Sequence, residues 1–184
     1  MNIYFLKQIW SKIPAENLSV ACFFQADSDA LHALFNITEP SVRAENSGFN
    51  RNVWEDSCAE LFLSFGNGFY YNFEINCIGG ILAQYGKNRY ERENLSPKIL
   101  KTIEVVSTLG SQPFGVVREK RAYRLKVTIP KKVFVFDGCK IDTMSLIGNI
   151  YKCADKSPTP HYMTLFDIIS EKPDFHRPEF FKKL

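Results

Sequence analysis

VWEDSCAELFLSFGNGFYYNFEINCIGG, residues 53–80, is the stretch of sequence that predicts the fold. Two segments of alternating side chains flank Gly66-Asn67-Gly68, and Gly and Asn tolerate the positive φ angles of a tight turn. Because side chains alternate with period two along a strand, one face of the predicted hairpin is apolar. That face carries Ala59, Leu61, Leu63, Phe65, Tyr71, Phe73, Ile75 and Cys77.

The opposite face of the same hairpin is polar, with two carboxylates and two amides, and the chain enters it past Trp54 and the pair Glu55-Asp56. Its residues are Glu60, Asn72, Glu74 and Asn76. Sugar hydroxyls need polar partners, and the C–H faces of a pyranose need an aromatic surface. The pattern therefore predicts a candidate sugar site on this face.

Short alternating segments separated by turn signals recur through the rest of the chain, with no long helical periodicity. They are Ser19–Ala26, Leu31–Thr38, Ile81–Tyr85, Ile103–Leu109, Tyr123–Ile129 and Met144–Tyr151. Ser96 and Pro97 favour the start of a short helical turn over 98–101. This organisation predicts one all-β domain over residues 1–184, an antiparallel β-sandwich with short helical turns. The proline-rich end, residues 157–184, is expected to wrap across the sandwich in an extended form and to cover sheet edges.

The composition is typical of a soluble globular protein, with 45% hydrophobic and 23% charged residues and a net charge of +3. Basic residues are scattered, so nucleic acid is not an expected partner. No apolar run approaches the roughly 20 residues of a membrane span, so no membrane partner is expected. The N-terminal residues do not resemble a secretory signal. We expect a cytoplasmic protein, or a periplasmic or extracellular one if a signal was removed before this numbering begins.

The five cysteines are spread along the chain without a CxxC pair, which indicates neither a disulfide framework nor a zinc site. Alternation places Cys58 and Cys77 on opposite faces of the hairpin. We expect all five to be reduced and no pair to be positioned to bridge.

Several strings together resemble the stand-alone relatives of the family 9 carbohydrate-binding modules of glycan-degrading bacteria. They are VWEDSCAELFLSF, YYNFEINCIGGILAQYG, GNIYKCAD, PHYMTLFDI and PDFHRPEFF, and they span about residues 19–181. The resemblance implies a DOMON-like, immunoglobulin-like β-sandwich that binds carbohydrate without catalysis. In such modules two aromatic side chains hold a terminal sugar, while acidic, amide and Arg side chains bond its hydroxyls.

The resemblance assigns site roles to particular residues. Trp54 matches the first stacking aromatic, Glu60 a hydroxyl-binding acid, and Asn149 an amide ligand. The relatives carry Ser-Trp where this chain has Thr164-Leu165-Phe166, so the second aromatic is Phe166 or the nearby Tyr162. The complete expected set is Trp54, Glu60, Asn76, Arg89, Arg92, Asn149, Lys152, Tyr162 and Phe166, with spacing unable to choose between the two arginines.

Other interpretations of these residues stay open at the level of sequence. Trp54 could be a core residue, and Glu60, Glu74 and Asn76 could form a solvated face. Two carboxylates on neighbouring strands repel, so a cation or ligand should offset them. Ca²⁺ would suit the oxygens of Glu55, Asp56, Glu60 and Glu74, but no EF-hand spacing is present, and we expect no cofactor or metal.

Three further functions stay open at the level of sequence. Glu60 and Glu74 could be the carboxylate pair of a glycan-metabolism enzyme, and Cys153 with His161 could form a thiol nucleophile, although no oxyanion-hole motif accompanies them. The chain could also be an interaction domain without a sugar site. We expect His176 and Arg177 to pin the tail to the sheet by hydrogen bonds.

Carbohydrate is the expected partner, with glycoside hydrolases as associated enzymes.

Overall fold

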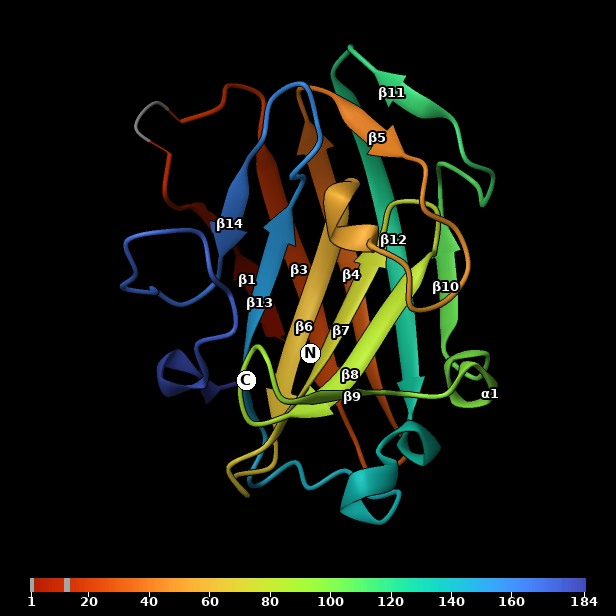
Figure 1. The fold of residues 1–184 in the computed structure, drawn as a ribbon, viewed down its shortest axis with the longest axis vertical. Helices are drawn as coiled ribbons and strands as arrows, with labels where there is room; N and C mark the ends of the chain where they lie inside the picture. The colour runs from red at the N-terminus through yellow and green to blue at the C-terminus, as the bar shows by residue number, and fades with distance from the viewer. Residues whose placement is uncertain (1, 12–13) are drawn as a thin grey trace.

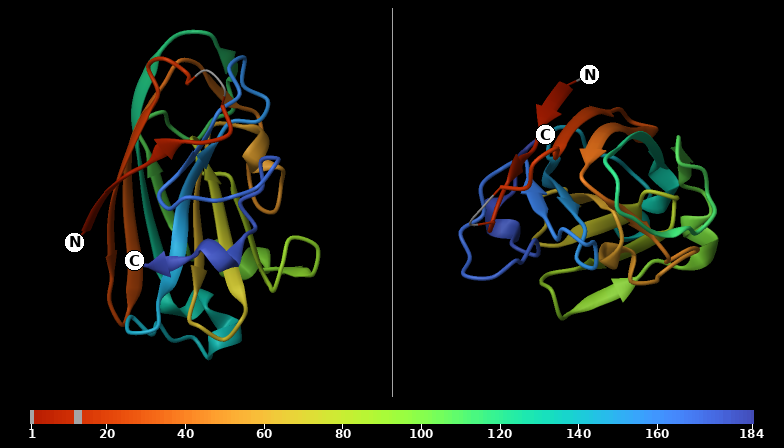
Figure 2. Two further views of the ribbon diagram at one scale, coloured as in Figure 1. Left: turned by 90° about the vertical axis from the view of Figure 1, so that its left-hand side faces the viewer. Right: turned by 90° about the horizontal axis from the view of Figure 1, so that it is seen from above.

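The computed structural model describes residues 2–11 and 14–184. Two antiparallel sheets pack face to face as a β-sandwich, and the side view separates the two layers clearly (Figure 1, Figure 2). The smaller sheet has the strand order β1-β3-β4-β12-β10. Its strands are β1 (Asn2–Phe5), β3 (Ser19–Ala26), β4 (Ala30–Glu39), β12 (Arg121–Pro130) and β10 (Glu104–Ser107).

The larger sheet has the order β2-β14-β13-β6-β7-β8-β9, and β15 adds to the same edge of β13 as β14. Its strands are β2 (Lys7–Gln8), β14 (Tyr162–Thr164), β13 (Ile147–Cys153), β6 (Cys58–Ser64), β7 (Tyr70–Asn76), β8 (Ile81–Gly86), β9 (Arg92–Asn94) and β15 (Lys182–Lys183). A separate two-stranded ribbon pairs β5 (Val42–Ala44) with β11 (Gly115–Val117).

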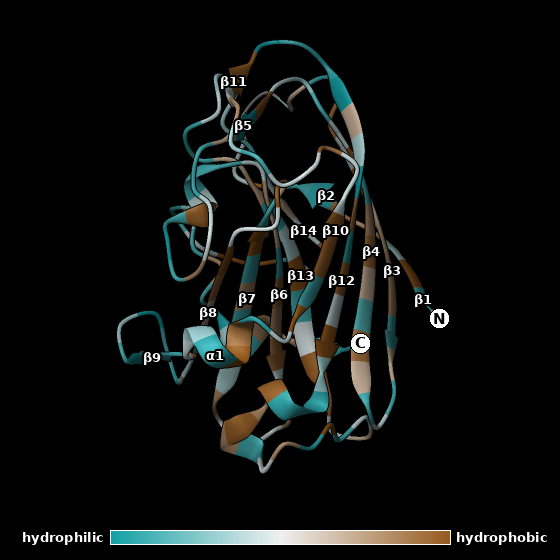
Figure 3. Ribbon diagram, turned by 90° about the vertical axis from the view of Figure 1, so that its right-hand side faces the viewer, coloured by the Kyte–Doolittle hydropathy of each residue, from teal (hydrophilic) through white to brown (hydrophobic). Residues whose placement is uncertain are grey.

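The predicted hairpin is confirmed as β6 and β7, joined by a turn in which Gly66 and Gly68 have positive φ angles of 82° and 81°. The predicted apolar face lies in the core between the sheets, with Leu61 and Phe73 directly opposite one another. Figure 3 shows hydrophobic residues along these central strands. The outer face is buried as well, because loops and the C-terminal tail cover it. The antiparallel β-sandwich prediction is therefore confirmed.

Short helical turns connect the strands. In α1 (Pro97–Leu100), the Ser96 side chain accepts a hydrogen bond from the N–H of Ile99, as the sequence predicts. The others are 3-10 turns, η1 (Val53–Glu55), η2 (Lys131–Val133), η3 (Val135–Asp137) and η4 (Pro178–Phe180). No helix of the described chain is long and apolar enough to cross a membrane.

The expected strand over 144–151 begins later, at Ile147. The Asp142 carboxylate accepts hydrogen bonds from the N–H groups of Met144 and Ser145, at 2.9 and 3.3 Å, and this holds a turn where the sequence suggested a strand. The side-chain preference of Asp for turns therefore outweighs the apolar pattern that follows it.

The tail covers a sheet edge as expected, because β14 and β15 both pair with β13. It also crosses the outer face of the larger sheet, in line with the expectation that it wraps across the sandwich. The Phe175 ring stacks on Tyr151 with centroids 4.2 Å apart, and the His176 ring lies 4.9 Å from that of Phe62. This covering segment forms one wall of the cavity described below.

All five cysteines carry free thiols. Cys58 and Cys77 belong to different apolar clusters on opposite faces of the sheet, as predicted. The expectation that no pair is positioned to bridge is wrong, however. Cys58 and Cys153 are direct cross-strand partners of β6 and β13 and share the outer face.

Candidate functional site

A cavity of about 410 Å³ opens on the outer face of the larger sheet. The strands β6, β7 and β8 form its floor, and its walls come from the loop before β6, the loop after β8 and the tail. Its volume lies within the range of small-molecule sites. The lining residues are Trp10, Asn50, Asn52, Trp54, Glu60, Phe62, Glu74, Leu82, Gln84, Arg89, Asn94, Cys153, Asp155, Tyr162, Pro173, Asp174, Phe175 and His176.

Glu60 and Glu74 stand directly opposite one another on this floor, and only 3% and 4% of them is exposed. Asn72 Nδ2 donates to Glu74 at 2.8 Å, and the Cys153 thiol donates to Glu60 at 2.9 Å. Across residues 2–11 and 14–184, no Lys or Arg forms an ion pair with either carboxyl group. The floor is thus acidic and lacks a paired cation within the described chain.

Burial shifts the titration of these acids. It raises the pKa of Glu74 to about 7. Burial and the neighbouring Glu74 hold the pKa of Glu60 well above its usual range, and burial raises the pKa of Asp155. Two carboxyl groups placed this close do not ionise independently, so the pair retains a proton near neutral pH. It can therefore both donate and accept hydrogen bonds.

The raised pKa of Glu74 predicts a pH-dependent stability. Its contribution is fully present below the ordinary pKa of 4.5 and is lost as the pH rises through about 7. Glu74→Gln removes this loss, so the variant should gain on the order of 3 kcal/mol relative to wild type between about pH 4.5 and pH 8. Urea unfolding across that range measures the difference. The exposed Glu93→Gln is the matched control, and a gain for Glu74→Gln that does not change with pH would contradict the assignment.

Aromatic side chains line the walls of the cavity. The turn η1 holds Trp54 at the edge, anchored by the fully buried Val53, and leaves the indole half-buried. Trp10 lies 5.3 Å from the Phe175 ring and 5.9 Å, edge to face, from Tyr162. The chain has two tryptophans, and both line this cavity.

Buried polar atoms without a hydrogen-bond partner gather at the same place. Within the described residues they include Trp10 Nε1, Asn50 Oδ1 and Glu74 Oε2, each on a residue that lines the cavity. A buried polar group left unpaired costs about 1–3 kcal/mol. One donor and two acceptors at a single cavity are therefore available to hydrogen-bond a polar ligand or water.

The rim carries an ion pair between Arg89 and Asp174, with 3.3 Å between the charged atoms. Next to it, His176 bonds the Tyr70 hydroxyl at 2.9 Å. Burial and the neighbouring arginines lower the pKa of His176 to about 3, so the ring is neutral. His176 pins the tail to the sheet as predicted, whereas Arg177 pairs with Glu179 inside the tail.

Four of the expected site residues line the cavity, namely Trp54, Glu60, Arg89 and Tyr162. Five do not: Asn76, Arg92, Asn149, Lys152 and Phe166. Each of these five has a structural partner that explains its position.

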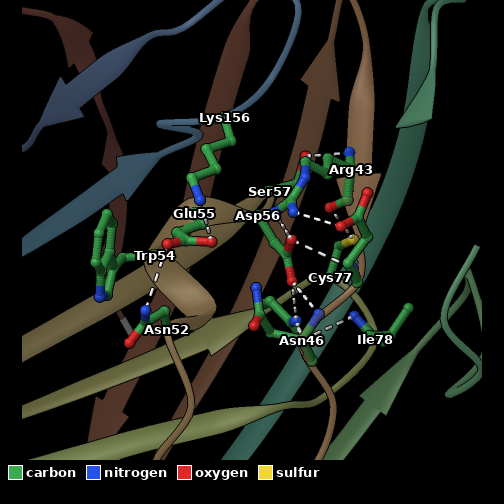
Figure 4. Close-up of polar contacts among 12 residues, drawn as sticks. Arg43, Asn46, Asn52, Trp54, Glu55, Asp56, Ser57, Cys77, Ile78 and Lys156 are labelled. Atoms are coloured by element: carbon green, nitrogen blue, oxygen red, sulfur yellow. Dashed lines mark hydrogen bonds and ion pairs between the residues drawn. The ribbon is translucent and has the colours of Figure 1, made fainter. Parts of the chain in front are cut away.

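Asn76 is fully buried and organises a loop. Its amide donates to Asn46 O at 2.6 Å and to Asp56 at 2.8 Å, and its oxygen accepts from the N–H of Gly80 at 2.7 Å. Figure 4 shows Asp56 joining Arg43 and Asn46 in this network, with Trp54 directed away from it. Alternation assigned Asn76 to the correct face of β7. Its side chain, however, forms hydrogen bonds that hold the turn after the strand, and it does not line the cavity.

Lys152 points to the other side of the sheet, into the core. Its ammonium pairs with Glu39 at 2.9 Å, and both side chains are fully buried. His161 Nε2 lies 3.1 Å from the same carboxylate, and Ser57 donates to it at 2.9 Å. These contacts make Lys152 and His161 structural, and they separate His161 from the Cys153 thiol with which it was considered a nucleophile pair.

Asn149 is likewise fully buried, and it bonds the backbone of Phe166, accepting from its N–H at 3.0 Å and donating to its carbonyl at 3.1 Å. The Phe166 ring lies beside the Lys182 ammonium, 5.5 Å from it, outside the cavity. The amide thus fixes the chain just after β14. Tyr162 is the expected second aromatic that does line the cavity.

Arg92 lies close to the floor without lining the cavity. Its guanidinium bonds the Asn72 side chain and stacks 4.2 Å from the centre of the Tyr70 ring. Burial lowers its pKa. The arginine therefore supports Asn72, which in turn bonds Glu74.

The oxygen set considered for Ca²⁺ does not converge. Glu55 pairs with Lys156 at 3.0 Å, and Asp56 pairs with Arg43. Both contacts are drawn in Figure 4, on different sides of η1. Two of the four residues whose oxygens would suit Ca²⁺ already have cationic partners.

Sequence reasoning missed several lining residues. Trp10 comes from the segment after β2, and Pro173 to His176 come from the tail, so neither follows from the alternation of the hairpin. The scarcity of tryptophan is a signal that could have pointed to Trp10 as a partner for Trp54, because the chain has two tryptophans. Asp155, which follows β13, also lines the cavity.

The comparisons with known proteins identify the family and the fold. Carbohydrate-binding family 9 matches residues 7–184. A candidate carbohydrate-binding protein from Bacteroides uniformis shares 33% identity and a TM-score of 0.89, covering 98% of this chain and 84% of its own. The search of curated proteins found no significant match.

Two structures of a family 9 module from Caldicellulosiruptor kristjanssonii share the fold at 13% identity. The complex with cellotriose has a TM-score of 0.56, covering 90% of this chain and 73% of that one. The complex with glucose has a TM-score of 0.50, covering 85% and 70%. Since a family match extends over nearly all the residues, the chain belongs to carbohydrate-binding family 9.

Proposed function

We propose that this protein binds a carbohydrate in the cavity above Glu60 and Glu74 and does not transform it. The observation that carries the proposal is the convergence of both tryptophans with three unpaired buried polar atoms on one cavity. Sugars combine apolar C–H faces with hydroxyls that donate and accept, and this lining offers both kinds of surface.

Different lining residues would contact different parts of a sugar. Trp54, Trp10 and Tyr162 supply aromatic surface for the ring faces. Glu74 Oε2 and Asn50 Oδ1 accept hydrogen bonds from hydroxyls, and Trp10 Nε1 donates one. Arg89 supplies a further donor at the rim, where it is half-exposed.

The carboxyl pair favours binding over hydrolysis. Glycosidases place their two carboxyl groups on either side of the scissile bond. Here both project from neighbouring strands on the same face, with Cβ atoms about 5 Å apart, and both are almost fully buried. A sugar therefore lies above the pair and not between its members. Glycoside hydrolases that release the bound sugar are the partners we expect.

Isothermal titration calorimetry tests the proposal, with glucose and cellotriose as first probes because structural neighbours bind them. A glycan array extends the search to other sugars. We expect saturable binding with one site and no release of reducing ends over long incubation. Failure to bind any sugar would favour an interaction domain, and hydrolysis of cellotriose would favour an enzyme.

A further inference from the structure

We propose that Cys58, Cys153 and Glu60 form a zinc site at the floor of the cavity, with its open coordination position facing the cavity. This role is separate from sugar binding. The three side chains share one face of two neighbouring strands, because Cys58 and Glu60 are two residues apart on β6 and Cys153 is the direct partner of Cys58 on β13.

The ligand atoms already lie close to a binding arrangement. The two sulfur atoms and a Glu60 oxygen all lie within 4.8 Å of one another. In a tetrahedral zinc site, ligands at 2.0–2.3 Å from the metal are about 3.3–3.8 Å apart. Small rotations of the three side chains would bring the ligand atoms from their present separations to the spacing that zinc requires. Cys153 and Glu60 line the cavity, so solvent and ions reach the cluster from there.

The electrostatics of the floor favour a divalent cation. Glu60 and Glu74 are opposed and buried, and within residues 2–11 and 14–184 neither has an ion pair with Lys or Arg. Two thiols and one carboxylate suit zinc, whereas Ca²⁺ takes six or more oxygen ligands. The thiol content therefore selects the metal, and the free Glu74 oxygen stays available to a sugar.

Binding should release protons. A cysteine thiol without a metal is mostly protonated near neutral pH, since its ordinary pKa is about 8.5. Zinc binds thiolate, and each thiol loses its proton to solvent as its bond to the metal forms. The apparent affinity should consequently rise with pH.

The test is a Co²⁺ titration of the reduced, metal-stripped protein, followed by displacement with Zn²⁺. We expect one equivalent to bind with a thiolate-to-cobalt charge-transfer band, and one equivalent of Zn²⁺ to remove the band. Cys153→Ser leaves Cys58 as the one thiolate ligand, so it should clearly reduce the intensity of the band. It should also weaken Zn²⁺ binding by more than about 10–100-fold, because losing a residue that merely orients a ligand usually costs that much.

Matched controls are Cys139→Ser, an exposed thiol, and Cys77→Ser, a buried thiol on the core side of the sheet. Both should keep the band. Circular dichroism checks that Cys153→Ser is folded, and Cys58→Ser is the second variant. Absence of the band in wild type, or a band of undiminished intensity in both Cys58→Ser and Cys153→Ser, would overturn the zinc site. Because no sugar enters the assay, either result leaves the carbohydrate proposal standing on its own test.

Discussion

Replacing Lys152 by Met should lower the free energy of unfolding by about 3–5 kcal/mol, because the change leaves a buried carboxylate without its ammonium partner. Glu39 receives Lys152 at 2.9 Å, His161 at 3.1 Å and the Tyr123 hydroxyl, all in the interior. Burial by itself would raise the pKa of Glu39, yet Lys152 and His161 outweigh it and lower the pKa to about 2. The network joins both sheets, since Glu39 ends β4 and Lys152 belongs to β13.

Lys156→Met is the matched control for this experiment. Lys156 also pairs with a glutamate, at 3.0 Å from Glu55, but 59% of its side chain is exposed. Exposed pairs contribute about 0–1 kcal/mol, so the control should unfold almost like wild type in urea. The double variant Lys152→Met with Glu39→Gln should recover part of the loss. If Lys152→Met and Lys156→Met had equal free energies of unfolding, a structural role for Lys152 would be contradicted.

Replacing Trp54 by Ala should weaken sugar binding by on the order of 1–3 kcal/mol, about 5–150-fold in Kd, because a stacked aromatic surface is lost. The half-buried indole forms a wall of the cavity and belongs to a one-turn helix. Isothermal titration calorimetry with cellotriose, or with the strongest ligand from the array, measures the change. Urea unfolding should show that the fold is kept.

Phe166→Ala is the control for Trp54→Ala. The sequence resemblance offered Phe166 or Tyr162 as the second stacking aromatic. If that residue were Phe166, Phe166→Trp would strengthen binding, because it restores the larger ring that the relatives carry. Because the ring lies outside the cavity beside Lys182, neither change should alter the affinity for the same sugar. A loss of binding in Phe166→Ala comparable with that in Trp54→Ala would place the site elsewhere.

The hairpin could be predicted because its two faces are set by local alternation. A one-residue shift of register would have placed Phe73 outside and Glu74 in the core, so the pattern determines both pairing and burial. Glu60 and Glu74 were assigned to the correct face for the same reason. The place of Trp54 at the edge of the site could be predicted because the residue comes just before β6, the first strand of the hairpin.

The remaining site residues depend on contacts that alternation does not describe. By alternation the Asn149 side chain belongs to the outer face of β13. Its amide nevertheless bonds the backbone of Phe166 and not the cavity. Lys152 pairs with Ala59, so its side chain belongs to the face of β13 that packs in the core. The sequence offered no reason to expect this, because lysine is rarely buried. Trp10 and the tail residues reach the cavity from distant segments, so their approach is a property of the tertiary structure.

Tryptophan emission during a sugar titration tests the central claim most directly, because both tryptophans of the chain line the proposed site. The account predicts a saturable change in emission with the same midpoint as the calorimetric Kd, and Trp54→Ala should greatly reduce the affinity measured by the remaining Trp10. Calorimetric binding of the same sugar with no change in tryptophan emission would contradict the account, since the ligand would then bind away from this cavity.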